Sequence, residues 1–353
     1  MKEPKIFPIQ GDYPFCFYTR AYLPAVYSGQ TTVSEFLRKD ADISTARIPE
    51  KAMEADIIVF QRPTSRPSYD LAVLLKKKGK KIVFDNDDSY SGIPLERLEN
   101  ERQREIAGEL NKNLNDFVKI ADGVTVSTEF LKKEYSKINL NTIVLKNCID
   151  PLDEFPCKKN ETGKFRVGFV GSVTSNDDYI HIKDQIRRLD ERGDITLVIM
   201  GVKFADGTIM KSMGEDAEFW ASLKNVEWHH VVHITEYMMT LANLALDLAI
   251  IPRKEYDFNR AKSNLKFLEM SLLRIPVLAQ GFSDGTSPYQ GVDEPYMTIV
   301  IDNAEWYNEI VKVKEKYSHY SSLALQAHDY VIKNYNIKTF AHYWKSAIID
   351  LTK

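Results

Sequence analysis

Short apolar runs, continuous rather than alternating with polar residues, recur along this chain and are separated by stretches of helical pattern. Such runs are typical of strands that are covered on both faces, as in a parallel sheet. In the first half we predict helices at 69–78 and 95–120 and strands at 5–10, 32–36, 56–61, 81–85, 124–127 and 142–146. The alternation favours parallel βαβ units over a sandwich of antiparallel sheets.

A polar segment at 151–164, with two prolines and one glycine, is the predicted linker to a second series of the same kind. The strands expected beyond it lie at 166–171, 195–201, 226–230, 246–251, 277–279 and 297–301. Two successive α/β series of similar size predict two Rossmann-like domains that face each other across a cleft. The predicted divisions are a first domain at 1–150, the linker, a second domain at 165–336, and a C-terminal helix at 337–353 that can cross back to the first domain.

The charge and cysteine content exclude several classes of protein. The 353-residue chain carries 47 Lys and Arg against 50 Asp and Glu, so its net charge of −3 offers no positive excess for nucleic acid. Three cysteines without CxxC spacing exclude a disulfide framework and a zinc finger. The chain starts without an apolar signal region, and no run approaches the ~20 apolar residues of a spanning helix. We therefore expect a soluble, cytoplasmic protein.

The segment 256–280 combines a loop, a helix and a strand. Its leucines are spaced for one buried helix face, whereas Lys262, Lys266 and Glu269 follow i, i+4, i+7 spacing and share another face. Two interpretations of the charged face stay open at this point. It is either part of a ligand site or an ordinary i, i+3 salt bridge between Lys266 and Glu269 on a solvated helix.

The start of the same predicted helix is a candidate anion site. Ser263 or Asn264 can cap it, and the free N–H groups and the helix dipole there favour a negative charge. Arg260 and Lys262 add two positive charges at that end. A diphosphate fits such a site, and Glu269, two turns further on, can accept hydrogen bonds from ribose hydroxyls.

A glycine turn follows the first predicted strand of the second half. Gly171 would let the backbone approach a phosphate or a sugar, and Ser172 could donate a hydrogen bond to it. The alternative is a plain strand-to-helix turn in which Asn176 or Asp177 caps the helix. The turn lacks the full GxGxxG pattern of a dinucleotide site.

In the first half, Asp85, Asp87 and Asp88 follow a predicted strand directly. Carboxylates this close repel one another, so a raised pKa, a bound hydroxyl or a bound cation is expected unless they form an Asx-turn cluster. Arg20 lies in the segment 16–24, where it either reaches a ligand or forms an ion pair.

The string FNRAKSNLKFLE at 258–269, followed by IPV at 275–277, resembles the group 1, family 4-like glycosyltransferases of the GT-B fold, and within them a bacterial and phage branch. These enzymes carry an acidic motif of two glutamates on the helix that binds the nucleotide-sugar. Glu269 matches the second glutamate, which implies a contact to ribose. Ala261 stands in place of the first, and Arg274 replaces the usual glycine before the IPV turn.

The resemblance implies a retaining hexosyltransferase that moves a sugar from a nucleotide-diphosphate sugar to an acceptor hydroxyl, with no cofactor and no metal. The implied catalytic residues are Asp87, Asp88, Arg260 and Lys262, and the implied acceptor contacts are Arg20 and Asp88. Two further regions, around Gly201 and His233, would hold the nucleobase. The implied donor-binding residues are Gly171, Ser172, Gly201, His233, Arg260, Lys262, Ser263, Asn264 and Glu269.

Two other functions stay open. The first is a nucleotide-sugar-binding protein without transferase activity, which Ala261 in place of the first glutamate leaves open. The second is a GT-B epimerase or hydrolase, which would turn over the donor without an acceptor. The acceptor itself is a glycan, a lipid, a protein or a modified nucleobase. The lysine run at 76–81 is either a solvated helix end or a patch for peripheral membrane contact. The histidines at 229, 230 and 233 lack a fourth ligand nearby, so no zinc site is expected.

Overall fold

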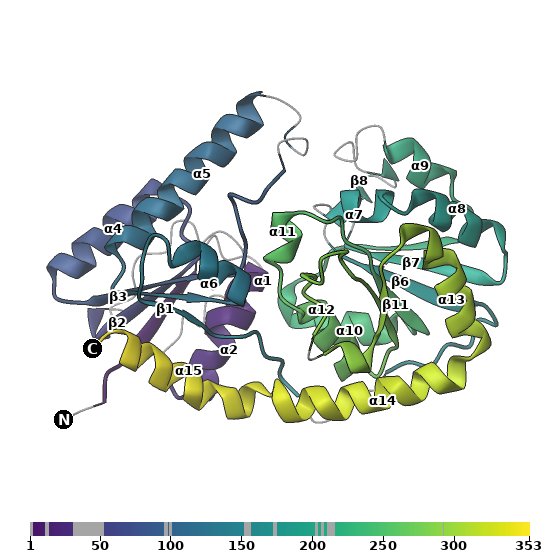
Figure 1. Cartoon of the computed structure of the whole chain (residues 1–353). Helices are drawn as coiled ribbons and strands as arrows, with labels where there is room; N and C mark the ends of the chain where they lie inside the picture. The colour runs from purple at the N-terminus through teal and green to yellow at the C-terminus, as the bar shows by residue number, and fades with distance from the viewer. Residues whose placement is uncertain are drawn as a thin grey trace. The chain divides into compact units, whose positions relative to one another are not determined.

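The computed structural model describes residues 3–10, 14–30, 53–94, 98, 101–151, 157–171, 175–201, 204–205, 208–209, 216–291 and 293–353. The chain divides into two compact units (Figure 1). Unit 1 comprises Met1–Asp150, Tyr256–Ser263 and Tyr335–Lys353, and unit 2 comprises Pro151–Glu255 and Asn264–Asn334. Each unit is built on its own parallel sheet with flanking helices, which confirms the predicted α/β class.

The sheet of unit 1 has five parallel strands in the order of the chain: β1 (Ile6–Gln10), β2 (Ile57–Gln61), β3 (Lys81–Asn86), β4 (Gly123–Val126) and β5 (Thr142–Val144). The register pairs Gln61 with Asp85, and Asn86 with Val126. The polar residues that end or follow these strands are therefore neighbours along the carboxyl edge of the sheet. Of the first-half strands predicted from sequence, the one at 32–36 lies outside the described residues, and the others are confirmed.

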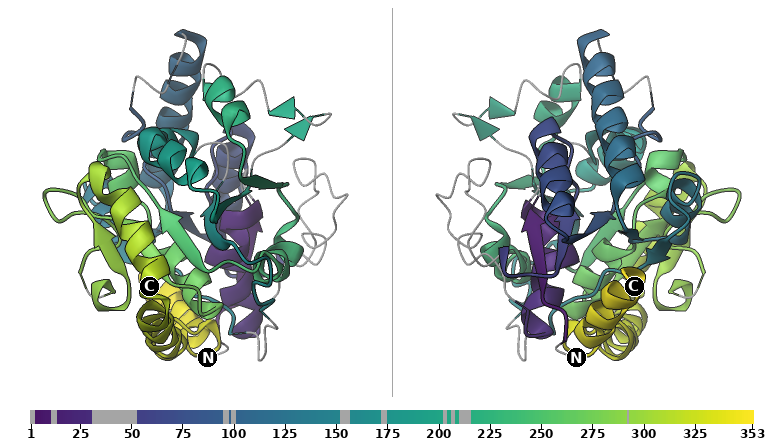
Figure 2. Two further views of the ribbon diagram at one scale, coloured as in Figure 1. Left: turned by 90° about the vertical axis from the view of Figure 1, so that its right-hand side faces the viewer. Right: turned by 90° about the vertical axis from the view of Figure 1, so that its left-hand side faces the viewer.

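Helices cover both faces of this sheet, because its strands are apolar on both sides. The helices of unit 1 are α1 (Pro14–Phe17), the π-helix η1 (Tyr18–Tyr22), α2 (Leu23–Tyr27), α4 (Arg66–Lys77), α5 (Glu101–Ile120), α6 (Glu129–Tyr135), α11 (Asp257–Arg260) and α15 (Ile337–Leu351). Helices α4 and α5 lie side by side on one face (Figure 2). Phe60, Phe84 and Phe117 pack together in the core on this face. On the other face Trp344 of α15 packs against Val59. The C-terminal helix is thus part of unit 1.

Unit 2 contains a six-stranded parallel sheet in the order β10-β7-β6-β11-β12-β13. The strands are β6 (Phe165–Val170), β7 (Ile195–Met200), β10 (Val226–His229), β11 (Leu248–Ile251), β12 (Val277–Gln280) and β13 (Thr298–Val300), and β8 (Phe204–Ala205) pairs separately with β9 (Thr208–Ile209). A buried core formed by Phe169, Ile250 and Trp306 joins the sheet to its helices. The second-half strand predictions are confirmed apart from shifts at their ends.

The helices of unit 2 are α7 (Asn176–Ile180), α8 (Lys183–Glu191), α9 (Asp216–Ser222), α10 (Ile234–Asn243), α12 (Leu265–Leu272), α13 (Trp306–Glu315) and α14 (Tyr317–Asn334), with short 3₁₀ helices η7 (Glu294–Tyr296) and η8 (Asn303–Glu305). None of the helices in the described part of the chain has both the length and the apolar composition that a membrane crossing requires.

The division into units differs from the predicted domains at 256–263. The sequence analysis placed this segment in the second domain, whereas it belongs to unit 1. The backbone N–H of Phe258 donates to the carbonyl of Gly92 at 3.1 Å, and the Thr128 hydroxyl donates to the carbonyl of Ala261 at the same distance. Ala261 is fully buried in the core of unit 1. These contacts are long-range in sequence, which is why local pattern did not reveal them.

A second difference is small. The predicted second domain extends to 336, but residues 335 and 336 belong to unit 1. Asn336 bridges to Ile149 in parallel, and its side chain caps α15 by accepting from the N–H of Lys338 at 2.9 Å. The return to unit 1 therefore begins just before the last helix rather than within it.

Replacing Gly92 with alanine tests the anchoring of the 256–263 segment. A Cβ atom at Gly92 would lie 2.7 Å from the Phe258 nitrogen and 2.9 Å from the Asp257 carbonyl carbon, and both are backbone atoms that yield little. We expect Gly92→Ala to cost about 1–3 kcal/mol and to lower the melting temperature by several degrees. The control Gly108→Ala lies in α5 with nothing within 4 Å of the new Cβ, and it should instead stabilise the helix by up to ~1 kcal/mol. A Gly92→Ala variant that melts like the wild type would contradict this account.

Candidate functional site

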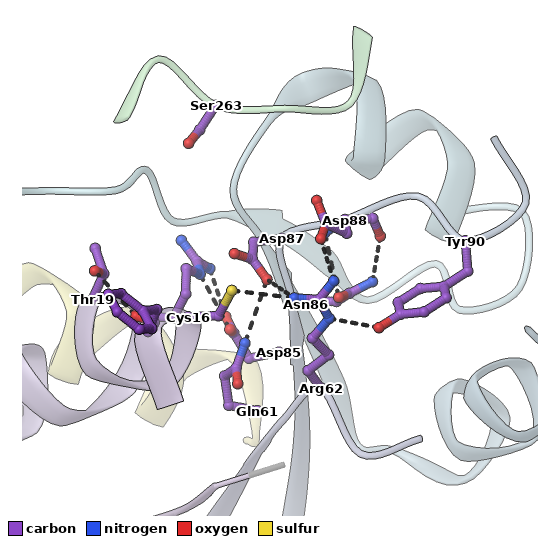
Figure 3. Close-up of polar contacts among 12 residues, drawn as sticks. Cys16, Thr19, Gln61, Arg62, Asp85, Asn86, Asp87, Asp88, Tyr90 and Ser263 are labelled. Carbon is purple, nitrogen blue, oxygen red and sulfur yellow. Dashed lines mark hydrogen bonds and ion pairs between the residues drawn. The ribbon is translucent and has the colours of Figure 1, made fainter. Parts of the chain in front are cut away.

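The end of β3 and the turn after it place three carboxylates, Asp85, Asp87 and Asp88, at the carboxyl edge of the unit 1 sheet (Figure 3). Asn86 holds the turn, because its side-chain amide donates to the carbonyl of Asp88 at 2.6 Å and to the Tyr135 hydroxyl at 2.5 Å. The backbone N–H of Asp88 in turn donates to the Asn86 side chain at 3.4 Å. Asn86, rather than the aspartates, therefore makes the Asx-type turn. The aspartates are left to interact with other groups.

Asp85 forms a buried ion pair with Arg20. The guanidinium donates to both carboxylate oxygens, from Nε at 3.1 Å and from Nη2 at 2.5 Å, and Thr125 donates a third hydrogen bond at 2.7 Å. Arg20 also donates to Asn147 at 3.1 Å and to the carbonyl of Leu145. Nearly all hydrogen-bonding capacity of the guanidinium is used within unit 1. Of the two roles predicted for Arg20, contact to a ligand or an ion pair, the structure contains the ion pair.

Asp88 is also fully engaged, by two cations from distant parts of the sequence. Lys262 donates to one carboxylate oxygen at 2.5 Å and Arg62 donates to the other. The carboxyl side chain is 9% exposed. Burial raises the pKa of Asp88, but Lys262 and Arg62 together outweigh burial and hold that pKa below its ordinary value. Arg62 adopts a left-handed backbone with φ of 52°, an unfavourable conformation for a side chain of this size that its contacts must hold in place.

Asp87 is the least engaged of the three carboxylates. Gln61 Nε2 lies 3.4 Å and Arg62 Nη1 lies 3.8 Å from its Oδ1, so both contacts are long and fall on one oxygen. The third neighbour is the Cys16 thiol, which accepts from Arg62 at 3.1 Å. Burial and Asp87 raise the pKa of this thiol, so the thiol stays protonated and is only a weak donor. Asp87, whose side chain is 14% exposed, therefore retains the capacity to accept hydrogen bonds from a ligand.

The residues predicted to form one anion site are divided between the units. Arg260, Lys262 and Ser263 belong to unit 1, whereas Asn264 and Glu269 belong to unit 2. Arg260 pairs with Asp257 at 3.3 Å, Lys262 pairs with Asp88, and the Ser263 hydroxyl accepts from Asn147 at 2.8 Å.

The predicted cap position at Asn264 is confirmed, but the predicted helix face shared by Lys262, Lys266 and Glu269 is wrong for Lys262. Helix α12 begins at Leu265, and the chain leaves helical geometry after Arg260, so Lys262 does not share a helix face with Lys266 and Glu269. Asn264 occupies the N-cap position, but neither it nor Ser263 makes a capping hydrogen bond. The Asn264 amide donates instead to Asp293 at 2.6 Å. A tertiary partner has outcompeted the local cap.

In unit 2, Glu269 lies on α12 within a compact polar group. Lys266 lies 3.0 Å from Glu269 Oε2, and the Tyr237 hydroxyl donates to the same oxygen at 2.9 Å. Lys266 also donates to the Tyr237 hydroxyl at 2.7 Å. The salt-bridge interpretation is thus confirmed in its geometry, but the pair is largely buried, with Lys266 24% and Glu269 12% exposed. Tyr237, on α10, is a partner of Glu269 that local sequence pattern does not reveal.

The glycine positions of unit 2 have distinct physical reasons. Gly201 has φ of 108°, which favours glycine, and it accepts no side chain without strain. A Cβ at Gly171 would lie 2.9 Å from the Tyr179 hydroxyl, so the backbone there is tightly approached. Ser172 lies outside the described residues. His233 serves as the N-cap of α10, where its ring nitrogen accepts from the N–H of Thr235 at 3.4 Å.

A cation that the sequence analysis missed follows β11. Arg253 donates to Asp178 at 2.7 Å, and the N–H of Lys254 donates to the other oxygen of that carboxylate at 2.9 Å. Strand β11 neighbours β6, whose end carries Gly171, so Arg253 and the glycine turn follow adjacent strands. The glycine turn itself has no Lys or Arg before Lys183. The signal available in the sequence was the basic pair directly after the apolar run at 248–251.

The lysine run at 76–81 has a structural role. Lys76 donates to the carbonyl of Ile120 at 2.5 Å, and Lys80 donates to the carbonyls of Met53 and Ala55 at 2.7 and 2.6 Å.

Among the described residues, no three or more His, Cys, Asp or Glu side chains are grouped so that they could hold a metal ion.

No protein-family model and no curated protein sequence matches the chain. Solved structures match in fold, among them a glycosyltransferase from Rickettsia africae, with 12% identity over 100% of both chains and a TM-score of 0.67. HepE from Anabaena, in complex with UDP and glucose, has 13% identity over 99% of this chain and 100% of its own, with a TM-score of 0.63. TarM has 12% identity over 83% of this chain and a TM-score of 0.56, and the match spans only 54% of TarM. The fold is that of the GT-B glycosyltransferases.

Replacing Asp88 with asparagine tests its ion pairs through pH. Because the folded pKa of Asp88 lies below that of the unfolded chain, its contribution to stability is present at neutral pH and is lost as the pH falls below about 5. Asp88→Asn should cost about 3–5 kcal/mol at pH 7, since it leaves buried cations unpaired, and the deficit should shrink in acid. The measurement is the melting temperature from pH 7 to pH 3. The control Asp70→Asn removes an exposed pair with Arg66 and should change little; an equal loss in both variants would refute the assignment.

Proposed function

We propose that the chain is a retaining glycosyltransferase that moves a hexose from a nucleotide-diphosphate sugar to an acceptor hydroxyl. The fold that it shares with glycosyltransferases supports this reading, and HepE is a neighbour described with UDP-glucose bound. The observation that carries the proposal is Glu269. It matches the second glutamate of the donor motif and is held on α12 with only one of its oxygens engaged by Lys266 and Tyr237.

Unit 2 binds the donor. Glu269 accepts hydrogen bonds from the ribose, and the glycine turn at Gly171 approaches the diphosphate. Arg253 supplies positive charge beside that turn, which the turn itself lacks up to Ile182. Positive charge aimed at the departing diphosphate stabilises the transition state, so side chains, rather than a metal, perform this task. Arg260 and Lys262, the cations that the resemblance implies for this role, are paired with Asp257 and Asp88 within unit 1.

Unit 1 binds the acceptor, and Asp87 is the residue that contacts the reacting hydroxyl. Both oxygens of Asp85 and of Asp88 are already paired with Arg20, Arg62 or Lys262, so we assign these two residues positioning roles. In the reaction the acceptor oxygen bonds to the anomeric carbon, the bond from that carbon to the diphosphate oxygen breaks, and the hydroxyl proton passes to the leaving phosphate. The acceptor is a glycan, a lipid, a protein or a modified nucleobase.

A binding protein without catalysis is the competing function, and it rests on Ala261 in place of the first motif glutamate. Ala261 lies in the core of unit 1 and has no exposed surface. A glutamate there would bury a charge without a partner, at a cost of several kcal/mol. The alanine is therefore explained by packing, and it does not favour a loss of activity.

A thermal-shift series with UDP, GDP, ADP and CMP, and with their sugar conjugates, tests the donor site. A ligand at about 100 times its dissociation constant should stabilise the protein by ~2.7 kcal/mol and raise the melting temperature by several degrees. We expect one nucleotide to do so in the wild type and in Glu309→Ala, which breaks a comparable Glu–Lys pair on α13. Glu269→Ala should lose the shift. No shift with any nucleotide would refute the transferase proposal.

The role of Asp87 is tested by Asp87→Asn. The amide oxygen of asparagine can still accept a hydrogen bond, but it carries no charge. The variant should reduce acceptor-dependent nucleotide release by about tenfold, because hydrogen bonds to charged groups contribute about 1.5–3 kcal/mol and neutral ones about 0.5–1.5 kcal/mol. Donor affinity and melting temperature should stay near the wild-type values, since Asp87 makes only two long contacts and one to the weakly donating Cys16 thiol within the protein. Asp116→Asn, on α5, is the control for a general loss of charge. Wild-type transfer by Asp87→Asn would rule out this contact.

A further inference from the structure

Glu269 is fixed by more than a salt bridge. An i, i+3 pair on one helix is ordinarily mobile and contributes little, since both side chains are long and solvated. Here the Tyr237 hydroxyl joins the pair from a second helix: it donates to Glu269 Oε2 at 2.9 Å and accepts from Lys266 at 2.7 Å. Each of the three side chains therefore contacts the other two, at 2.7 to 3.0 Å. This closed triangle joins α10 to α12.

The triangle engages one carboxylate oxygen and leaves the other out. Both donors fall on Oε2, and Oε1 takes part in none of the three contacts. A carboxylate oxygen has two lone-pair sites and can accept two hydrogen bonds. The 2′- and 3′-hydroxyls of a ribose are two adjacent donors, one for each of the two hydrogen bonds that this oxygen can accept. A carboxylate whose orientation is held can accept from both with less loss of side-chain entropy than a mobile one.

Charge gives a second reason for the triangle. A glutamate alone beside a nucleoside diphosphate would repel the phosphates, whereas Lys266 at 3.0 Å makes the Glu269 group neutral overall. Tyr237 adds a donor without adding charge. Burial and Glu269 raise the pKa of Tyr237 well above its ordinary value, so its hydroxyl remains a donor across the working pH range.

We propose that Tyr237 and Lys266 are positioning residues that orient Glu269 so that the site selects ribonucleotides by their 2′,3′-diol. This inference deepens the proposed donor site and rests on it. Tyr237 acts through Glu269 and makes no contact with the nucleobase. The consequence is specific: loss of either residue lowers the preference for ribose over a sugar without the diol, and it leaves the rest of nucleotide binding in place.

The test compares UDP, GDP and ADP with their 2′,3′-dideoxy counterparts by calorimetry on the full chain. The diphosphate that binds the wild type should do so at least about tenfold more tightly than its dideoxy form, as expected for hydrogen bonds to a charged group. Tyr237→Phe and Lys266→Met should each reduce this ratio to about threefold or less, with the affinity for the dideoxy form changed less than about twofold. Each removes one polar contact and keeps most of the side chain's volume.

Matched controls separate positioning from general damage. Tyr320→Phe removes a hydroxyl from an equally buried tyrosine, 7% exposed like Tyr237, on α14. Lys312→Met breaks the Lys312–Glu309 pair of α13. Both should keep the wild-type ratio. An unchanged ratio in Tyr237→Phe and Lys266→Met, or an equal loss of affinity for both forms of the nucleotide, would overturn the positioning role while the donor site stands. Absence of binding by any diphosphate to the wild type would instead refute the proposed function itself.

Discussion

The ion pairs of Asp88 with Arg62 and Lys262 are the interaction on which the arrangement of unit 1 depends most. They join a residue after β2, a residue after β3 and a residue that lies 174 positions further along the chain. The carboxylate is almost completely buried, so neither cation can exchange it for water without a large loss of free energy. This constraint holds the segment 256–263 in unit 1, where Ala261 then packs into the core and Ser263 meets Asn147.

Three aspartates within four residues have different tasks because their partners differ. Asp85 neutralises Arg20 and thereby ties the first helical segment to the sheet, and Asp88 neutralises the two cations just described. Asp87 lies between them in sequence and has only long contacts. Like charges this close would be unstable alone. Because Asp85 and Asp88 are each neutralised by cations, the repulsion on Asp87 is reduced, and this carboxylate can stay open to a ligand.

Unit 2 follows the same principle with a different set of residues. Asp178 accepts from Arg253 and from the backbone of Lys254, and Glu269 accepts from Lys266 and Tyr237. Each of these two carboxylates is thus oriented by a cation and a second donor. The chain passes from Ser263 of unit 1 to Asn264 of unit 2 across one peptide bond, and α12, which carries Glu269, begins at the next residue.

The sequence alone was sufficient for the described strands, for the helices predicted at 69–78, 95–120 and 337–353 apart from their ends, for the α/β class and for the carboxyl-edge position of Asp85, Asp87 and Asp88. These follow from local hydrophobic period and turn composition. The sequence was insufficient for the choice among those aspartates, for the end of the helix pattern between Arg260 and Leu265, for the unit to which 256–263 belongs, and for the partnership of Tyr237 with Glu269. Each of these depends on contacts across 26 to 174 residues, as in the pairs Arg62–Asp88 and Lys262–Asp88. Periodicity reports which face of an element is buried, but only the folded chain decides which charge meets which, because the energy of an ion pair depends on distance and burial, and neither is a property of local sequence.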